Sequence, residues 1–273
     1  MLTKWQRGLN WGAVCLENHD QPRIVSHYGD DVSYHERSAK LLATMQLTLR
    51  GTPFIYQGQE IGMTNFDFTS LSQLNDVESH GVDKLMRSLL IPAGVRWNWI
   101  KTASRDNSRT PMQWTAQQGA GFTNGKPWLG INGNHTDINY QDQQSRPDSI
   151  LSYYRKMIAL RKASDTLKYG DFSPVYSKAG VIAYSRHLGS DKYITILNFA
   201  DKQAFVEPKL LLIPLPGHLS PAAAPKRPQP EPGPATTAIV GSKPCEVLIS
   251  NTDRETFDGS LAPWEAIILR LQA

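Results

Sequence analysis

Two short apolar runs near the start of the chain are each followed by a polar cluster. Residues 11–16 (WGAVCL) and 52–56 (TPFIY) are largely apolar, and the polar stretches ENHDQPR and QGQE follow them. A short apolar run that polar residues bound is typical of a strand buried on both faces, as in a parallel sheet. We therefore predict two buried strands, each with a polar loop at its C-terminal end.

The segment between these runs has the spacing of a helix. Residues 34–50 end just before Gly51, a common helix terminator, and apolar residues recur along them at Leu41, Leu42, Met45 and Leu49. The order strand, helix, strand predicts a βαβ unit of a parallel sheet. In such folds the ligand site lies at the C-terminal ends of the strands, so both polar clusters are expected at that edge.

The pattern changes twice further along the chain. Residues 63–148 show little periodicity and many Gly, Asn, Gln and Trp residues, which favours long irregular loops with a functional role. A second helix is predicted over 149–162, with Asp148 as its N-cap. Beyond Gly170 the apolar residues alternate, and we predict strands at 181–185, 193–197, 247–249 and 266–271.

These strands predict a separate antiparallel β domain over residues 168–273. A Pro-rich insert at 214–236 interrupts it. The insert has too few apolar residues to pack, so an extended or disordered loop is expected there.

Composition and charge exclude several classes of function. The 273 residues are 40% hydrophobic and 20% charged, as expected of a globular protein with one large or two smaller domains. The net charge of +4 is spread among acidic residues, so a nucleic-acid partner is not expected. No apolar run approaches the roughly 20 residues that span a bilayer, so no membrane association is expected.

The N-terminal residues lack the apolar segment of a secretory signal, and the two cysteines are far apart. Cys15 and Cys245 fit buried free thiols in a reducing cytoplasm better than a disulfide framework, so a cytoplasmic location is expected. No residue spacing indicates a metal or another cofactor, and none is expected.

Five motifs occur in an order that is specific to one family. They are NHDQPR at 18–23, GTPFIYQGQEIGMTN at 51–65, SRDNSRTPMQW at 104–114, AGFTNGKPW at 120–128 and LAPWEAIILRL at 261–271. Together they resemble the C-terminal half of a glycoside hydrolase family 13 α-glucosidase, in the group of oligo-1,6-glucosidase, dextran glucosidase and trehalose-6-phosphate hydrolase. The resemblance is weaker around residues 76–103 and in the Pro-rich insert.

The resemblance implies an α/β plus all-β fold, in which a TIM (β/α)8 barrel precedes an antiparallel β-sandwich. Residues 1–167 would then hold the last two βα units of the barrel, with long loops, and residues 168–273 the sandwich. The implied activity is that of a retaining exo-α-glucosidase, which acts on α-1,6 and α-1,4 gluco-oligosaccharides.

The same resemblance assigns roles to residues of the first and third motifs. Asp20 matches the carboxylate that stabilises the transition state, and His19 and Arg105 match residues that bind the sugar. The chemistry agrees, because a fixed carboxylate aimed at the anomeric carbon helps most when positive charge develops there. Taken by themselves, however, His19 and Asp20 fit a loop that caps the next helix better than a reactive site.

Other polar and aromatic residues of the motifs receive supporting roles. Arg23 and Asp106 are expected in ion pairs around the site, and Glu60 is expected to support it without acting as a catalyst. For Trp114 and Trp128 two interpretations stay open, namely stacking on sugar rings or packing inside the loops.

A retaining glycosidase needs a nucleophile and an acid/base about 5 to 5.5 Å apart. The resemblance places both upstream of NHDQPR, on strands that the 273 residues do not include. We therefore expect little or no hydrolase activity from this chain alone, and the complementary N-terminal half of the barrel as a partner beside the oligosaccharide substrate. The alternatives are a non-catalytic sugar-binding or interaction protein, and part of a trehalose-6-phosphate hydrolase.

Overall fold

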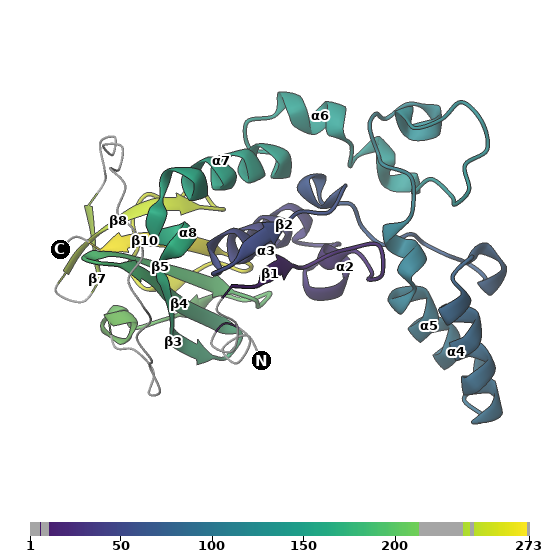
Figure 1. Ribbon diagram of the computed structural model, residues 1–273, viewed down its shortest axis with the longest axis horizontal. Coiled ribbons are helices and arrows are strands. Elements are labelled where there is room, and N and C mark those ends of the chain that lie inside the picture. Colours follow the sequence, from purple (N-terminus) through teal and green to yellow (C-terminus); the bar gives the residue numbers. More distant parts are fainter. Residues whose placement is uncertain (1–5, 7–10, 213–236, 241–242, 272–273) are drawn as a thin grey trace. The chain divides into compact units, whose positions relative to one another are not determined.

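The computed structural model describes residue 6 and residues 11–212, 237–240 and 243–271, so the predicted Pro-rich loop lies outside the described residues. The chain divides into two compact units. The sheet unit comprises Met1–Val14, Arg37–Phe54 and Tyr153–Ala273, and the loop unit comprises Cys15–Glu36 and Ile55–Ser152. Figure 1 follows the chain through both units by colour.

An antiparallel sheet of six strands, in the order β3-β4-β5-β10-β8-β7, dominates the sheet unit. Its alternating apolar residues, such as Ile194 and Ile196 of β5 and Ile267 and Leu269 of β10, share one buried core. The four strands predicted after Gly170 are therefore confirmed. The six strands are β3 (Asp171–Lys178), β4 (Val181–Leu188), β5 (Asp191–Asn198), β7 (Thr237–Val240), β8 (Lys243–Ser250) and β10 (Ala266–Leu271).

The prediction missed strand β3 and the short strands. In β3 the residue Pro174 interrupts the apolar pattern, yet β3 lies at one edge of the sheet, where a missing amide donor is tolerated. The register with β4 shifts between Pro174 and Tyr176, as at a bulge. Two further strands pair in a small sheet of their own, namely β6 (Ala204–Phe205) and β9 (Ser260–Leu261), and the 3-10 helix η6 (Pro208–Leu212) lies between them in the sequence.

Both predicted helices are present within two residues of their expected ends. They are α3 (His35–Thr48) and α7 (Ile150–Ala163), and the short helix α8 (Asp165–Tyr169) follows α7. Asp148 was expected as the cap of α7, but Ser149 directly precedes the helix. Its hydroxyl accepts the amide of Ser152 at 3.1 Å, which is the geometry of an N-cap.

The two strands predicted at the start of the chain form a sheet of their own, with β1 (Ala13–Cys15) beside β2 (Thr52–Phe54). The Gln46 side chain of α3 donates to the carbonyls of Val14 and Phe54 at 3.1 and 2.7 Å, and so links the strands. Burial on both faces was predicted and is wrong, because Val14 is the one buried residue of the two strands. The sheet has no third strand among the described residues.

The loop unit contains more helix than predicted. Its helices are α2 (Ile24–Tyr28), α4 (Val77–Ser88), α5 (Ala93–Ala103) and α6 (Tyr140–Ser145), and its 3-10 helices are η1 (Gln59–Ile61), η2 (Leu71–Gln73), η3 (Arg105–Ser108), η4 (Gln118–Gly121) and η5 (Gly133–Thr136). The irregular conformation expected throughout 63–148 is therefore wrong in part. Helices α4 and α5 expose several apolar side chains, such as Leu85 of α4 and Trp99 of α5.

Both cysteines are free thiols, and Cys245 is buried as predicted. Cys15, the last residue of β1, is exposed, contrary to the prediction. Within the described part of the chain, no helix is long and apolar enough to span a membrane.

Candidate functional site

The polar loop after β1 is closed by a buried ion pair. Arg23 Nη1 donates to Glu17 Oε1 at 2.6 Å, and both side chains are almost fully buried. The second carboxylate oxygen of Glu17 accepts the amide of Ile24, the first residue of α2, at 3.0 Å. The predicted ion-pair role of Arg23 is thus confirmed, and Glu17 holds the loop and the start of α2 together.

The same arginine connects this loop to the two others that form the site. Arg23 donates to the carbonyl of Gln57 at 2.7 Å and to that of Ser108 at 3.4 Å. The Ser108 hydroxyl donates in turn to the carbonyl of Gln21 at 2.5 Å. The loops after β1 and β2 and the 3-10 helix η3 are therefore fastened together beneath His19 and Asp20.

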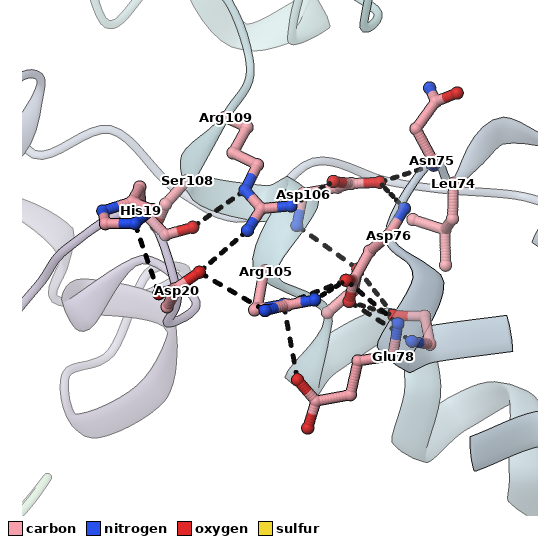
Figure 2. A network of polar contacts seen from close by, with 12 residues as sticks. His19, Asp20, Leu74, Asn75, Asp76, Glu78, Arg105, Asp106, Ser108 and Arg109 are labelled. Carbon is pink, nitrogen blue, oxygen red and sulfur yellow. Dashed lines mark hydrogen bonds and ion pairs between the residues drawn. The ribbon is translucent and has the colours of Figure 1, made fainter. Parts of the chain in front are cut away.

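Asp20 lies between two arginines (Figure 2). Its Oδ1 accepts Arg109 Nη2 at 2.9 Å and Arg105 Nη1 at 3.5 Å, while His19 Nε2 lies 3.2 Å from Oδ2. The amide of Asp20 donates to the Asn18 side chain at 2.8 Å, which tightens the turn. The side chain of Asp20 stays 49% exposed and that of His19 69%, so both face solvent. The structure thus brings His19, Asp20 and Arg105 together.

Arg109 is a site residue that the sequence prediction missed. Besides Asp20, it binds the carbonyl of His19 through Nε at 2.9 Å and Asp106 Oδ1 through Nη1 at 3.4 Å. Asp106 is fully buried and has the ion-pair role that was predicted for it. The signal was available, since Arg109 belongs to the same SRDNSRTPMQW motif as Arg105 and follows it by one helical turn.

Arg105 is held from the side opposite Asp20. Its Nε donates to Asp76 Oδ1 at 2.9 Å, Nη2 contacts the same oxygen, and Glu78 Oε2 lies 3.4 Å from Nε. Asp76 and Glu78 were not predicted, because they lie in the stretch where the resemblance to known motifs is weakest. No pattern in a single sequence would have paired them with Arg105.

Asp106 completes a closed ring of polar contacts. Its Oδ2 accepts the amides of Asn75 at 2.6 Å and Asp76 at 2.9 Å (Figure 2). The ring thus runs from Asp20 through Arg105 to Asp76, and returns through Asp106 and Arg109. Charges held in such a ring are oriented before any ligand arrives.

A comparison with protein families identifies the family of the chain that carries this arrangement. Residues 1–170 match the family model of the alpha amylase catalytic domain. The chain belongs to the alpha-amylase family. The match covers the NHDQPR loop, both strands β1 and β2 and the SRDNSRTPMQW segment, and so includes every residue of the ring.

Individual members of the alpha-amylase family are similar over much of this chain. An oligo-1,6-glucosidase of Bacillus cereus is 39% identical over 76% of the chain and 38% of its own length. A trehalose-6-phosphate hydrolase of Bacillus subtilis is 35% identical over 99% of the chain and 45% of its own length. The crystal structure of an isomaltulose synthase from Klebsiella sp. LX3 matches with a TM-score of 0.82 at 36% identity, over 99% of the chain and 45% of that protein.

The chain therefore spans less than half the length of these relatives. The solved relative matches through both the catalytic-domain part and the antiparallel sheet, because the match extends over 99% of the chain. Two of these relatives are named as a glucosidase and a hydrolase.

Three other predicted residues lie outside the ring. Burial raises the pKa of Glu60, against hydrogen bonds and the charge of Arg23. The supporting role of Glu60 stays a prediction. The rings of Trp114 and Trp128 are both exposed, and Trp114 packs edge-on against Tyr140 with ring centroids 5.6 Å apart. Neither tryptophan is therefore part of a loop core, and sugar stacking stays a prediction for both.

The described residues include no group of three or more His, Cys, Asp or Glu side chains arranged to hold a metal. The site presents the exposed carboxylate of Asp20 beside the imidazole of His19 and the guanidinium of Arg105. Such a group can bind a polyhydroxylated ligand through directed hydrogen bonds, and can stabilise a positive charge that develops beside it.

Proposed function

We propose that this chain supplies the C-terminal part of a retaining exo-α-glucosidase that acts on α-1,6 and α-1,4 gluco-oligosaccharides. The observation that carries the proposal is the position of Asp20, whose Oδ1 is held by Arg105 and Arg109 while the carboxylate remains half exposed. The similarity to oligo-1,6-glucosidases supports the substrate class.

In this proposal His19 and three residues of the ring have different roles. Asp20 stabilises the positive charge that develops at the anomeric carbon of the glucosyl unit, and acts most strongly in the transition state. His19 and Arg105 donate hydrogen bonds to the hydroxyls of the same unit. Arg109 holds Asp20 in position, since its guanidinium binds both the Asp20 carboxylate and the carbonyl of His19.

The proposal gives each region of the chain a place in the larger enzyme. Residues 1–167 supply the last two βα units of a (β/α)8 barrel with their long loops, and residues 168–273 supply the antiparallel β-sandwich. A complementary N-terminal half adds the other barrel strands. Exposed side chains on and beside the β1–β2 sheet support this, because Trp11 is 48% and Phe54 55% exposed where a closed barrel would cover them.

We further propose that the 273-residue chain alone has little or no hydrolase activity. Retention of configuration needs a nucleophile and an acid/base about 5 to 5.5 Å apart, in addition to a stabilising carboxylate. Asp20 fills the stabilising role, and the complementary half would bring the other two carboxyl groups. A cytoplasmic location is part of the proposal and is supported by the two free cysteines, one of them exposed.

The test compares the purified chain alone with the chain mixed with a separately expressed N-terminal half of an oligo-1,6-glucosidase. We expect no turnover of p-nitrophenyl α-glucoside or isomaltose by either part, and turnover by the mixture that the Asp20→Asn variant loses. Enzyme-like turnover by the chain alone would overturn the proposal. Sugar binding by the chain without turnover in the mixture would favour the alternative of a non-catalytic sugar-binding protein.

The same mixture also tests the substrate. Trehalose 6-phosphate is included because a trehalose-6-phosphate hydrolase is similar over almost the whole chain. Faster turnover of isomaltose than of trehalose 6-phosphate supports the proposed substrate class, and the reverse order would replace it with the phosphosugar.

A further inference from the structure

The carboxylate of Asp76 binds both the first turn of helix α4 and the guanidinium of Arg105. Its Oδ2 accepts the amide of Ser79 at 3.3 Å and the Ser79 hydroxyl at 2.8 Å, and so caps helix α4. Its Oδ1 accepts Arg105 Nε at 2.9 Å and also contacts Arg105 Nη2. Oδ1 also accepts the amide of Glu78 at 3.2 Å, so both oxygens serve the helix, and Oδ1 in addition binds the guanidinium that faces Asp20.

This contact determines which part of Arg105 remains available. With Nε and Nη2 turned towards Asp76, Nη1 is the nitrogen that lies 3.5 Å from Asp20. Glu78 also contacts Nε at 3.4 Å, but its side chain is 64% exposed, whereas that of Asp76 is 2% exposed. The buried carboxylate is the rigid partner, because an exposed one is mobile and screened by water.

Asp76 is itself fixed through its main chain. The buried carboxylate of Asp106 accepts the Asp76 amide at 2.9 Å (Figure 2). Burial opposes ionisation of Asp76, but hydrogen bonds from Arg105 and Ser79 outweigh it and lower the pKa of this carboxyl. The charged carboxylate of Asp76 is thus held in place on the side of Arg105 that faces away from Asp20.

We propose that Asp76 is a positioning residue, which orients the Arg105 guanidinium so that Nη1 faces Asp20 and the bound glucosyl unit. The proposal rests on the proposed function, in which Arg105 donates to a sugar hydroxyl. It adds a residue from the start of α4, a segment in which the sequence motifs gave no assignment. Asp76 does not touch the sugar in this arrangement and acts through Arg105.

A purely structural role as the cap of α4 is the competing explanation. The Asp76→Asn variant separates the two, since asparagine caps a helix as well as aspartate does. It removes the negative charge that binds the guanidinium and keeps one acceptor oxygen for the cap. Asp76→Ser is a second variant, because serine also caps a helix but is too short to reach Arg105.

The experiment measures binding of methyl α-D-glucopyranoside to the full chain by NMR titration. The Nε–H signal of Arg105 is followed in the same spectra, and thermal melting shows whether each variant is folded. We expect both Asp76 variants to bind the glucoside about tenfold more weakly, since a charge-assisted hydrogen bond is lost. We also expect the Nε–H signal of Arg105 to exchange faster with water.

Asp83→Asn is the matched control. Asp83 belongs to the same helix and also pairs with two arginines, Arg87 and Arg96, but no contact joins it to Arg105 among the described residues. Its substitution should leave the affinity for the glucoside unchanged. An equal loss in Asp83→Asn and Asp76→Asn would show that only the integrity of the helix matters, and would overturn the proposal.

Coupling to Arg105 gives the decisive comparison. In an Arg105→Met background the Asp76→Asn substitution should have no further effect on affinity, whereas independent roles would make the two losses add. If the unsubstituted chain binds no glucoside, the proposed function fails, and this inference fails with it. If the chain binds and Arg105→Met weakens binding while Asp76→Asn does not, only the inference about Asp76 is overturned.

Discussion

Arg109 Nη2 lies 2.9 Å from Asp20 Oδ1, although the two residues are separated by 89 positions in the sequence. The same guanidinium binds the carbonyl of His19 and the buried carboxylate of Asp106. Arg109 therefore fixes both the side chain of Asp20 and the main chain just before it. A carboxylate fixed in this way needs no reorientation when charge develops beside it.

Replacement of Arg109 should reduce catalysis more than binding. In the mixture with a complementary half, we expect Arg109→Met to lower kcat about tenfold to a hundredfold with little change in KM, because a misplaced carboxylate weakens transition-state contacts first. Arg109→Lys should recover part of the loss, since lysine keeps the charge but not the forked contacts. The measurement is steady-state kinetics, and a rise in KM alone would contradict the expected role.

The buried pair of Glu17 and Arg23 should be important for stability. Glu17→Gln leaves the Arg23 guanidinium buried without its countercharge, and we expect a loss of about 3 to 5 kcal/mol in the free energy of unfolding. The double variant Glu17→Leu, Arg23→Met should lose less than either single change, because it leaves no uncompensated charge. Urea denaturation of the unsubstituted chain, Glu17→Leu, Arg23→Met and the double variant gives the comparison, and additive losses would argue against a coupled pair.

Acid should loosen the helical pair α4 and α5. Burial opposes ionisation of Asp83, but hydrogen bonds from Arg96 and Arg87 lower its pKa, and the pKa of Asp76 is lowered likewise. A carboxyl with a lower pKa in the folded state binds fewer protons there, so its stabilising effect is complete above the unfolded pKa of about 3.9 and is lost as the pH falls through the folded value.

We therefore expect helix content to be constant above about pH 5 and to fall below about pH 4. Circular dichroism across this range measures it. The Asp83→Asn variant should show a weaker dependence on pH in the acid range, because one of the two titrating carboxyls is gone. An unchanged acid transition in this variant would show that other groups control it.

The two cysteines should differ in reactivity. Cys15 is exposed, whereas Cys245 is buried in the core of the sheet unit, and burial raises the pKa of the Cys245 thiol to about 11. Since the thiolate is the reactive form, a thiol reagent at neutral pH should label Cys15 in the folded protein and both residues after denaturation. The Cys15→Ser variant should show no rapid labelling, and labelling of Cys245 in the folded state would contradict the burial.

Local patterns in the sequence were sufficient for much of the fold. Helical spacing predicted α3 and α7 within two residues of their ends, and alternation predicted β4, β5, β8 and β10. These elements bury regular apolar faces, so their period appears in the sequence. Strand β3 was missed because Pro174 breaks the pattern, and in α4 and α5 several apolar residues, such as Leu85 and Trp99, remain exposed.

The sequence by itself also determined the family motifs, and with them Asp20, His19 and Arg105 as candidate residues. Only the tertiary structure decided which groups hold them. Arg109, Asp76 and Asp106 reach the site through contacts between residues up to 90 positions apart, and contacts at such separations leave no periodic trace in a single chain. Burial of β1 and β2 was likewise decided by the structure, since the cover of a strand depends on its neighbours and not on its own residues.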